Sequence, residues 1–175
     1  AIHNASNRSS KPFIKINCSA IPEALWETEF FGYEKGSFSS ATKTKMGKVE
    51  LAQGGTLFLD GLGEMNLKFQ EKLLRFLRHG EFQRIGSKEV LRANVRVIAA
   101  TSLNLQRLVQ KGLFLEELYF LLQTVKLTIP PLRQRLEDLP LLVDFFIEIF
   151  NRKLGKKVHG ITPEALQFLI NYDWP

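Results

Sequence analysis

The stretch of this sequence best suited to chemistry is an apolar run that ends in a single carboxylate. Residues 54–60 read Gly-Gly-Thr-Leu-Phe-Leu-Asp, and Asp60 is the last of them. A strand that delivers one Asp in this way can hold Mg²⁺ beside the phosphates of a nucleotide, directly or through water. The alternative is that Asp60 ends a strand and caps the turn that follows. The spacing alone does not decide between these two interpretations.

A Walker B strand, as such a run is called, should be preceded by a phosphate-binding loop with the pattern Gly-x-x-x-x-Gly-Lys-Ser/Thr or a close variant. That pattern is absent, and the first glycine of the chain is Gly32. Either the nucleotide interpretation is wrong, or the chain starts just after its phosphate-binding loop. The N-terminus, Ala1-Ile2-His3-Asn4, has neither an initiator Met nor an apolar signal region, which favours an origin inside a longer protein.

Four short apolar runs are predicted to form the strands that position Asp60. They lack the polar alternation of a half-exposed sheet, so we expect them to be buried. Helical patterns lie between them, and this alternation predicts an α/β fold with a parallel sheet. The predicted strands are 13–17, 56–60, 95–100 and 125–129, and the predicted helices among them are 67–77, 104–110 and 116–123.

Polar side chains end three of these strands, and ligands of an open parallel sheet bind at the carboxyl ends of its strands. We therefore expect the functional site at this edge. A cysteine nucleophile or a histidine-based site is disfavoured, because the cysteine lies among apolar residues and no histidine has an evident carboxylate partner in sequence. The polar strand ends are Asn17-Cys18-Ser19, Asp60 and Thr101-Ser102.

Two segments depart from this alternation. Residues 25–47 have no clean period and are rich in Gly, Ser and Thr, which predicts an excursion from the sheet, a loop with a helix rather than a strand pair. Residues 80–92 predict an extended pair or a loop before the third strand. Pro130 and Pro131 then punctuate the chain, and we place a domain boundary near residue 131.

The remainder of the sequence is helical only. Residues 137–153 predict one amphipathic helix, with Pro140 in its first turn. Thr162 is predicted to cap a second helix that begins at Pro163.

Composition excludes several classes of protein. With 24 Lys plus Arg against 18 Asp plus Glu, the net charge is +6, but the basic residues are scattered, unlike those of a nucleic-acid interface. An apolar content of 45% can fill a core, so a mainly disordered chain is excluded. One cysteine excludes an internal disulfide framework and a zinc finger. No apolar run approaches the roughly 20 residues of a membrane helix.

Taken in order, seven stretches of this chain resemble the central AAA+ domain of bacterial enhancer-binding proteins, the activators of sigma-54 RNA polymerase. The resemblance covers nearly the whole chain. It implies a three-layer parallel sheet of the P-loop NTPase type over residues 1–131, with the insertion at about 25–47, followed by the start of an all-α lid over 132–175. The matching stretches are 13–22, 31–36, 54–60, 70–75, 95–101, 130–135 and 172–175.

The resemblance also implies a mechanism. Members of the family form rings that hydrolyse ATP with Mg²⁺, and a loop reading Gly-Ala-Phe-Thr-Gly-Ala contacts sigma-54. Hydrolysis moves this loop and remodels the closed promoter complex. An exposed Phe at its tip would anchor the partner, unless it folds back into the core. In this chain the loop is Gly36, Ser37, Phe38, Ser39, Ser40 and Ala41.

Further expectations follow from the same resemblance. Asn17, Asp60, Thr101 and Ser102 would contact the nucleotide, with Asp60 holding Mg²⁺ through water. The partner would be sigma-54 RNA polymerase in the cytoplasm, and DNA would be bound only by a domain outside this chain. The family's P-loop helix leads into the stretch that matches Ala1-Ile2-His3, so a truncated start explains the missing loop. The chain also ends before the lid's second sensor arginine.

The catalytic positions depart from the family one after another. The Glu that follows the Walker B Asp and polarises the attacking water is Gly61 here. The two arginine fingers, which act across a subunit interface, are Leu115 and Leu121, and the ring is expected to be weakened accordingly. The sensor Asn is Ser102. Asn17, which in the family holds the Walker B Glu in an idle position, has no carboxylate to hold.

Three hypotheses follow from these departures. The first is a fold-competent member of the family that is deficient in ATP hydrolysis. The second is an active ATPase that uses other residues, of which Glu64 is a weak candidate because the family carries a Glu there as well. The third is an interaction module that retains contact with sigma-54 or the polymerase through Phe38 without any nucleotide.

Overall fold

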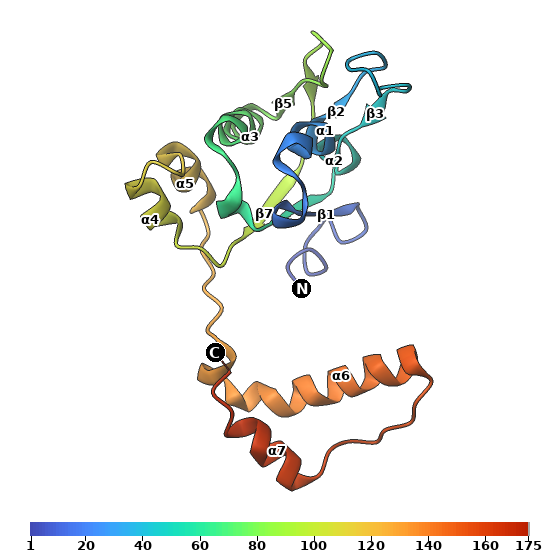
Figure 1. Cartoon of the computed structure of the whole chain (residues 1–175), viewed down its shortest axis with the longest axis vertical. Helices are drawn as coiled ribbons and strands as arrows, with labels where there is room; N and C mark the ends of the chain where they lie inside the picture. The colour runs from blue at the N-terminus through green and yellow to red at the C-terminus, as the bar shows by residue number, and fades with distance from the viewer. Residues whose placement is uncertain (175) are drawn as a thin grey trace. The chain divides into compact units, whose positions relative to one another are not determined.

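A computed structural model describes residues 1–174, which divide into two units. The first spans residues 1–125 and holds the sheet, and the second begins at Lys126 and contains helices only (Figure 1). Pro175, the last residue of the predicted lid, lies outside the described residues. No helix among residues 1–174 has both the length and the apolar character needed to cross a membrane.

The sheet of the first unit has three parallel strands, in the order β1 (Phe13–Asn17), β4 (Thr56–Asp60) and β7 (Arg96–Ala100). This confirms the first three predicted strands and the α/β class. The central strand is buried as expected, and the side chains of Leu57 and Leu59 are fully inaccessible to solvent. The outer strands are more open than their apolar sequences predict, because each has a neighbour on one side only among the described residues.

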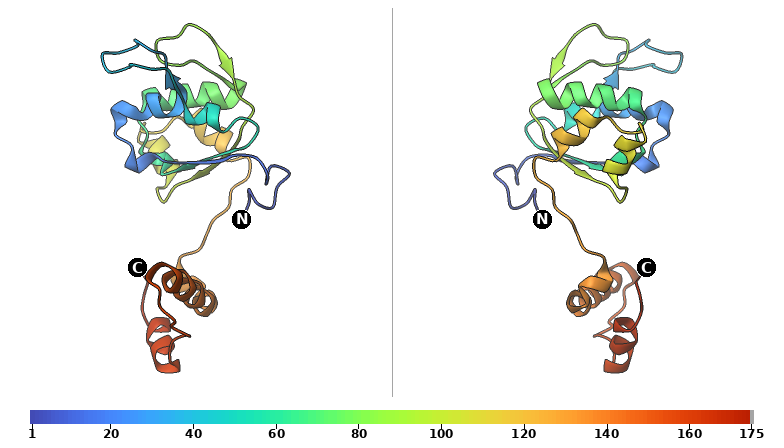
Figure 2. Two further views of the ribbon diagram at one scale, coloured as in Figure 1. Left: turned by 90° about the vertical axis from the view of Figure 1, so that its right-hand side faces the viewer. Right: turned by 90° about the vertical axis from the view of Figure 1, so that its left-hand side faces the viewer.

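The fourth predicted strand, residues 125–129, is wrong. These residues form an irregular segment, drawn in Figure 2 without a strand arrow. The side chains of Val125, Leu127 and Ile129 are at least 70% exposed. An apolar run forms a strand only where it pairs with another strand, and residues 125–129 pair with none of the strands in the described part of the chain.

Two helices of the first unit, α3 (Leu67–His79) and α4 (Leu105–Gln110), begin after an Asn whose side chain caps them. The longest, α3, is capped by Asn66, whose side chain accepts a hydrogen bond from the Phe69 N–H at 2.8 Å, and it ends at the left-handed Gly80. The other helices of this unit are α1 (Trp26–Phe31), α2 (Lys48–Leu51) and α5 (Glu116–Leu122).

The insertion at 25–47 contains both a helix and a strand pair, so the prediction of a helix and loop without a pair was incomplete. After α1, β2 (Gly32–Tyr33) pairs antiparallel with β3 (Lys45–Met46) and closes the base of the loop (Figure 1). Two residues on each side leave too little pattern for alternation to reveal a strand. The predicted extended pair at 80–92 is confirmed as β5 (Glu81–Phe82) with β6 (Leu91–Arg92).

A buried glutamine fixes the start of α5 against α3. The Gln70 side chain is fully buried, and its Nε2 donates to the carbonyls of Met65 at 2.6 Å and Leu113 at 3.0 Å. Its Oε1 accepts the Leu115 N–H at 2.8 Å. One buried side chain thus satisfies three backbone groups.

Replacing this glutamine should destabilise the first unit strongly. The Gln70→Leu variant leaves three backbone groups unpaired, so we expect the free energy of unfolding to fall by about 3 kcal/mol. The melting temperature should drop by roughly 6–12 °C, measured by thermal unfolding. The exposed Gln83→Leu, which loses one solvent-accessible hydrogen bond to the Lys88 carbonyl, is the control and should change little. Equal losses in the two variants would refute this role for Gln70.

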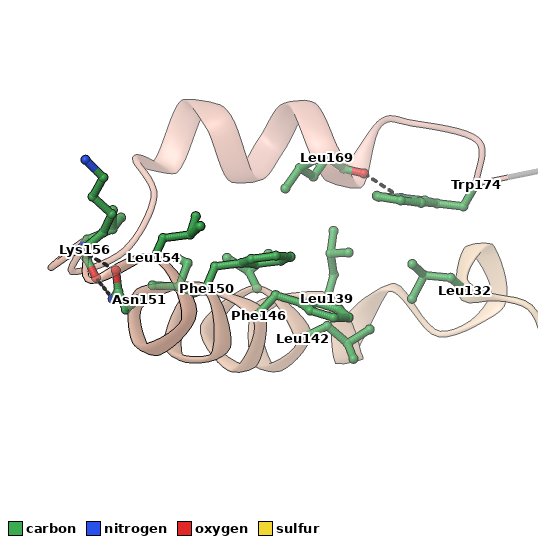
Figure 3. Close-up of a pocket in the computed structure, with 13 residues that line it drawn as sticks. Leu132, Leu139, Leu142, Phe146, Phe150, Asn151, Leu154, Lys156, Leu169 and Trp174 are labelled. Carbon is green, nitrogen blue, oxygen red and sulfur yellow. Dashed lines mark hydrogen bonds between the residues drawn. The ribbon is translucent and has the colours of Figure 1, made fainter.

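The second unit consists of α6 (Leu139–Leu154) and α7 (Pro163–Ile170), which confirms both predicted helices. Pro140 lies in the first turn of α6, and the Thr162 hydroxyl accepts the Ala165 N–H at 3.3 Å as the N-cap of α7. The two helices flank an apolar groove of about 380 Å³, lined by side chains such as Phe146, Phe150 and Leu169 (Figure 3).

Candidate functional site

The carboxyl edge of the sheet brings together the polar strand ends that the sequence singles out. In the strand register Asn17 lies opposite Asp60, and Asp60 lies opposite Ala100, so Thr101 and Ser102 continue along the same edge. Thr101 uses its hydroxyl locally, accepting the Leu103 N–H at 3.0 Å. The four residues predicted to contact a nucleotide therefore lie at the ends of three neighbouring strands.

The carboxylate of Asp60 is paired with an ammonium group from the neighbouring strand. The Nζ of Lys15 lies 3.0 Å from Asp60 Oδ2 and 5.6 Å from the centre of the Phe58 ring. The side chain of Asp60 is 39% exposed, so solvent screens this pair and little stability depends on it. The carboxylate remains accessible at the edge.

The turn after β4 carries no side chain next to Asp60. Gly61 has a left-handed backbone, with φ at +77°, and leads into the short 3₁₀ helix Leu62–Glu64. The next carboxylate, that of Glu64, accepts a hydrogen bond from the Ser19 hydroxyl at 2.9 Å. Ser19 lies in a 3₁₀ turn, Cys18–Ala20, that follows β1. The hydroxyl thus joins the ends of β1 and β4 across the edge.

Cys18, the neighbour of Ser19, is chemically quiet. Its side chain is 1% exposed, and burial, followed by the negative charge of Asp60, raises the pKa of the thiol to about 12. The thiol is therefore protonated at neutral pH and is a poor nucleophile. Among residues 1–174, no group of three or more His, Cys, Asp or Glu side chains could hold a metal ion by itself.

The two leucines at the predicted finger positions lie on α5, which packs against α3 and α4. Leu115 is the N-cap residue of α5, is partly buried and packs against the hydrophobic core. Leu121 lies in the last turn and is partly exposed. Neither side chain carries a charge or a hydrogen-bond donor, so this helix can offer no cation to a phosphate.

The loop predicted to contact sigma-54 leaves its Phe at the surface. The Gly36 N–H donates to the Ala41 carbonyl at 2.8 Å, which closes a short turn with Phe38 inside it. Phe38 is 37% exposed and meets the Tyr33 ring edge-on, with 4.9 Å between the ring centres. Ser40, in place of a family glycine, does not have a positive φ and is accommodated without left-handed strain.

The base of this loop is held by an arginine that sequence reasoning missed. Arg84, from the segment after β5, donates through its Nη1 to Glu34 at 2.7 Å and through its Nη2 to Glu50 at 2.6 Å. Its side chain is only 19% exposed. The same segment packs on the loop, since a Cβ at Gly86 would lie 2.5 Å from that of Ser37. The two carboxylate partners of Arg84 lie 50 and 34 residues away in sequence, and local sequence patterns cannot reveal such pairs.

The hydrogen bonds at the base of the loop shift the pKa of Glu34. A hydrogen bond from the Thr44 hydroxyl, followed by one from Arg84, lowers the pKa of Glu34 below its ordinary 4.5. Because its folded-state pKa is depressed, Glu34 contributes stability above pH 4.5, and that contribution is lost as the pH falls through the folded value. Glu34 is solvent-accessible, so the contribution is small.

Removing Arg84 should loosen the loop base while the rest of the unit stays folded. We expect Arg84→Met to raise the rate of amide exchange in residues 32–47 by about tenfold, the effect of one charge-assisted hydrogen bond after solvent screening. Hydrogen-exchange mass spectrometry measures this. The control is Arg92→Met, which removes an exposed pair with Glu81 and should leave the loop unchanged. Unchanged exchange in Arg84→Met would show that the arginine does not hold the loop.

Comparisons with known proteins agree with this geometry. Residues 1–128 match the model of the sigma-54 interaction domain, and residues 133–175 match that of the AAA+ ATPase lid domain. The chain is similar to a Nif-specific regulatory protein of Azotobacter vinelandii, 46% identical over 175 residues, which are 100% of this chain and 33% of that protein. It is also 46% identical over 175 residues to the transcriptional regulatory protein ZraR of Escherichia coli, covering 100% of this chain and 40% of that protein.

Solved structures give the same result. The structure of NtrX from Brucella abortus in complex with ATP matches 99% of this chain, with a TM-score of 0.87 and 35% identity, over 39% of that protein. The NtrX complex with ADP matches 99% of this chain with a TM-score of 0.88 and 35% identity, over 38% of that protein. The chain spans about a third of the length of the curated relatives it matches. It belongs to the family of sigma-54 interaction domains, the AAA+ domains of sigma-54-dependent regulators, and carries an AAA+ lid domain after it.

Proposed function

We propose that this chain is the central domain of a sigma-54-dependent transcriptional regulator that contacts sigma-54 RNA polymerase through residues 36–41 and is deficient in ATP hydrolysis. The observation that carries the proposal is the set of substitutions Gly61, Leu115 and Leu121. All three positions serve one reaction, whereas the three strands whose carboxyl ends present Asn17, Asp60 and Thr101 are formed. Random drift would rarely select these positions together.

The residues at the sheet edge are suited to binding ATP and Mg²⁺ but not to hydrolysing ATP. The carboxylate of Asp60 is accessible and is the hard oxygen ligand that Mg²⁺ prefers, and Asn17, Thr101 and Ser102 offer polar atoms beside it. Lys15 would have to leave Asp60 for a cation to approach. Bound Mg²⁺ would neutralise phosphate charge.

Hydrolysis needs groups that this edge lacks. A water molecule must be oriented and deprotonated by a carboxylate, and Gly61 provides none. The developing charge must be met by a cation, which the leucines of α5 cannot supply to a neighbouring subunit. Glu64 is the next carboxylate along the chain, but its Oε1 is engaged by the Ser19 hydroxyl. We therefore infer that nucleotide can be held at this edge without being cleaved.

The contact with sigma-54 follows from the loop. Phe38 is an accessible aromatic side chain on a turn whose base is fixed by Arg84, so it can enter a pocket of a partner without much loss of conformational entropy. The polymerase partner implies a cytoplasmic protein. Binding to DNA is assigned to a domain outside this chain, and formation of a homo-oligomeric ring is expected to be weakened by the loss of the two arginines.

A pull-down of sigma-54 by the full-length protein, with and without a non-hydrolysable ATP analogue, tests this proposal. Binding that increases with the analogue, together with absent hydrolysis, supports it. Binding that is the same without nucleotide favours the alternative of a nucleotide-independent interaction module. Hydrolysis at the rate of an active relative favours the other alternative, an ATPase that remodels the closed promoter complex.

A further inference from the structure

The backbone of Gly61 is fixed on both sides. Its N–H donates to the Ala100 carbonyl of β7 at 3.0 Å, and its own carbonyl accepts the Glu64 N–H at 3.2 Å. Both bonds, together with φ at +77°, hold the turn that follows Asp60. A substitution at this position therefore cannot be relieved cheaply by moving the main chain.

The space beside Gly61 is already occupied by a hydroxyl group. A Cβ added at this glycine would lie 2.3 Å from the Oγ of Ser19, far inside van der Waals contact. The backbone nitrogen and the Cβ of Ser19 would lie at 3.4 Å and 3.6 Å, which are ordinary distances. The conflict is therefore with the hydroxyl of Ser19 and not with its backbone.

That hydroxyl is not free to turn away without a cost. It donates to the Oε1 of Glu64 at 2.9 Å, and this bond joins the end of β1 to the turn after β4. We infer that Ser19 is a positioning residue of this edge, and that its hydrogen bond to Glu64 and a side chain at position 61 exclude one another. Ser19 and Gly61 thus act as a pair.

The pair of Ser19 and Gly61 also bears on the proposed function. This consequence depends on that proposal, whereas the pair itself does not. A glutamate placed at position 61 would meet the Ser19 hydroxyl, and the two side chains fit together only if that hydroxyl gives up its hydrogen bond to Glu64. At this edge, restoring a carboxylate at position 61 therefore involves Ser19 as well, and a change at position 61 alone does not reverse the deficiency in hydrolysis. Removing the Ser19 hydroxyl opens the position.

A double-mutant cycle on this chain tests the pair. We expect Gly61→Ala to lower the melting temperature by roughly 4–8 °C, and by only about half as much in the Ser19→Ala background. The left-handed strain is present in both backgrounds and cancels in the cycle. The matched control is Gly54→Ala, because Gly54 has φ at +73° and nothing within 4 Å of an added Cβ. The drop in melting temperature caused by Gly54→Ala should be the same with or without the Ser19 hydroxyl.

Additive losses for Gly61→Ala and Ser19→Ala would overturn the inference. If Gly61→Ala unfolds the chain, its folding in the Ser19→Ala background supports the inference, and its failure in both backgrounds overturns it. The ¹³C resonance of the Glu64 carboxyl group gives a second readout. It should move to the same position in Ser19→Ala and Gly61→Ala, and a resonance unmoved in Gly61→Ala would overturn the inference. Neither readout needs nucleotide. A finding that the protein hydrolyses ATP would therefore refute the proposed function but leave the inference about Ser19 and Gly61 standing.

Discussion

Returning glutamate to position 61 and arginine to positions 115 and 121 should raise the rate of ATP hydrolysis by at least about 10³-fold. The variant combines Gly61→Glu, Leu115→Arg and Leu121→Arg in the Ser19→Ala background, which opens the space at position 61. A positioned base contributes roughly 10²–10⁴-fold and an arginine finger about 10³–10⁵-fold. Phosphate release from the full-length protein under saturating ATP measures the rate.

The separate variants are the controls for this experiment. Groups that act as a unit are strongly non-additive, so each single reversion should stay within about tenfold of the unaltered protein. Adding Asp60→Asn to the combined variant should abolish the gain, because the carboxylate that would hold the cation is lost. If one reversion alone gives the full gain, or if the combined variant gains nothing while it still binds nucleotide, the account of the missing groups is wrong.

Removing the aromatic ring of Phe38 should weaken binding to sigma-54 strongly. We expect Phe38→Ser to weaken binding by at least about tenfold, since a buried aromatic anchor dominates an interface of this kind. Fluorescence anisotropy with labelled sigma-54 measures the affinity. The ring is 37% exposed and contacts Tyr33 only at its edge, so its loss should leave the fold intact.

The matched control for this variant is Phe120→Ser. Phe120 is 63% exposed and lies on α5, which is well separated from the loop between β2 and β3 (Figure 1). This variant tests whether the loss of any exposed Phe of the first unit weakens binding to sigma-54 to the same extent. Unchanged affinity in Phe38→Ser, or an equal loss in Phe120→Ser, would show that the loop is not the contact.

Local pattern was sufficient to predict most of the fold. The strands around Asp60 and the helices capped by Asn66 and Thr162 carry their own signals, namely apolar runs and capping side chains. The run at 125–129 carries the same signal but forms no strand, because the partner that a strand needs is not encoded in its own residues. The short pair of β2 with β3 gave too few residues to predict.

Part of the candidate site could likewise be predicted from the sequence, and part of it could not. Asp60 and its neighbours at the strand ends were predictable, because parallel strands bring their carboxyl ends to one edge. The contacts of Ser19 with Glu64, and of Arg84 with the loop base, join residues more than 30 positions apart and needed the folded chain. Ser19 was visible only as one more polar strand end.

The central claim is that this regulator holds nucleotide without cleaving it, and single-turnover hydrolysis tests it most directly. The full-length protein is mixed in excess with radiolabelled ATP and Mg²⁺, and bound ATP and released phosphate are followed together. We predict that ATP binds and that cleavage stays below roughly 10⁻² s⁻¹, well under the 1–10³ s⁻¹ typical of enzymes. Cleavage of bound ATP at about 1 s⁻¹ would contradict the claim.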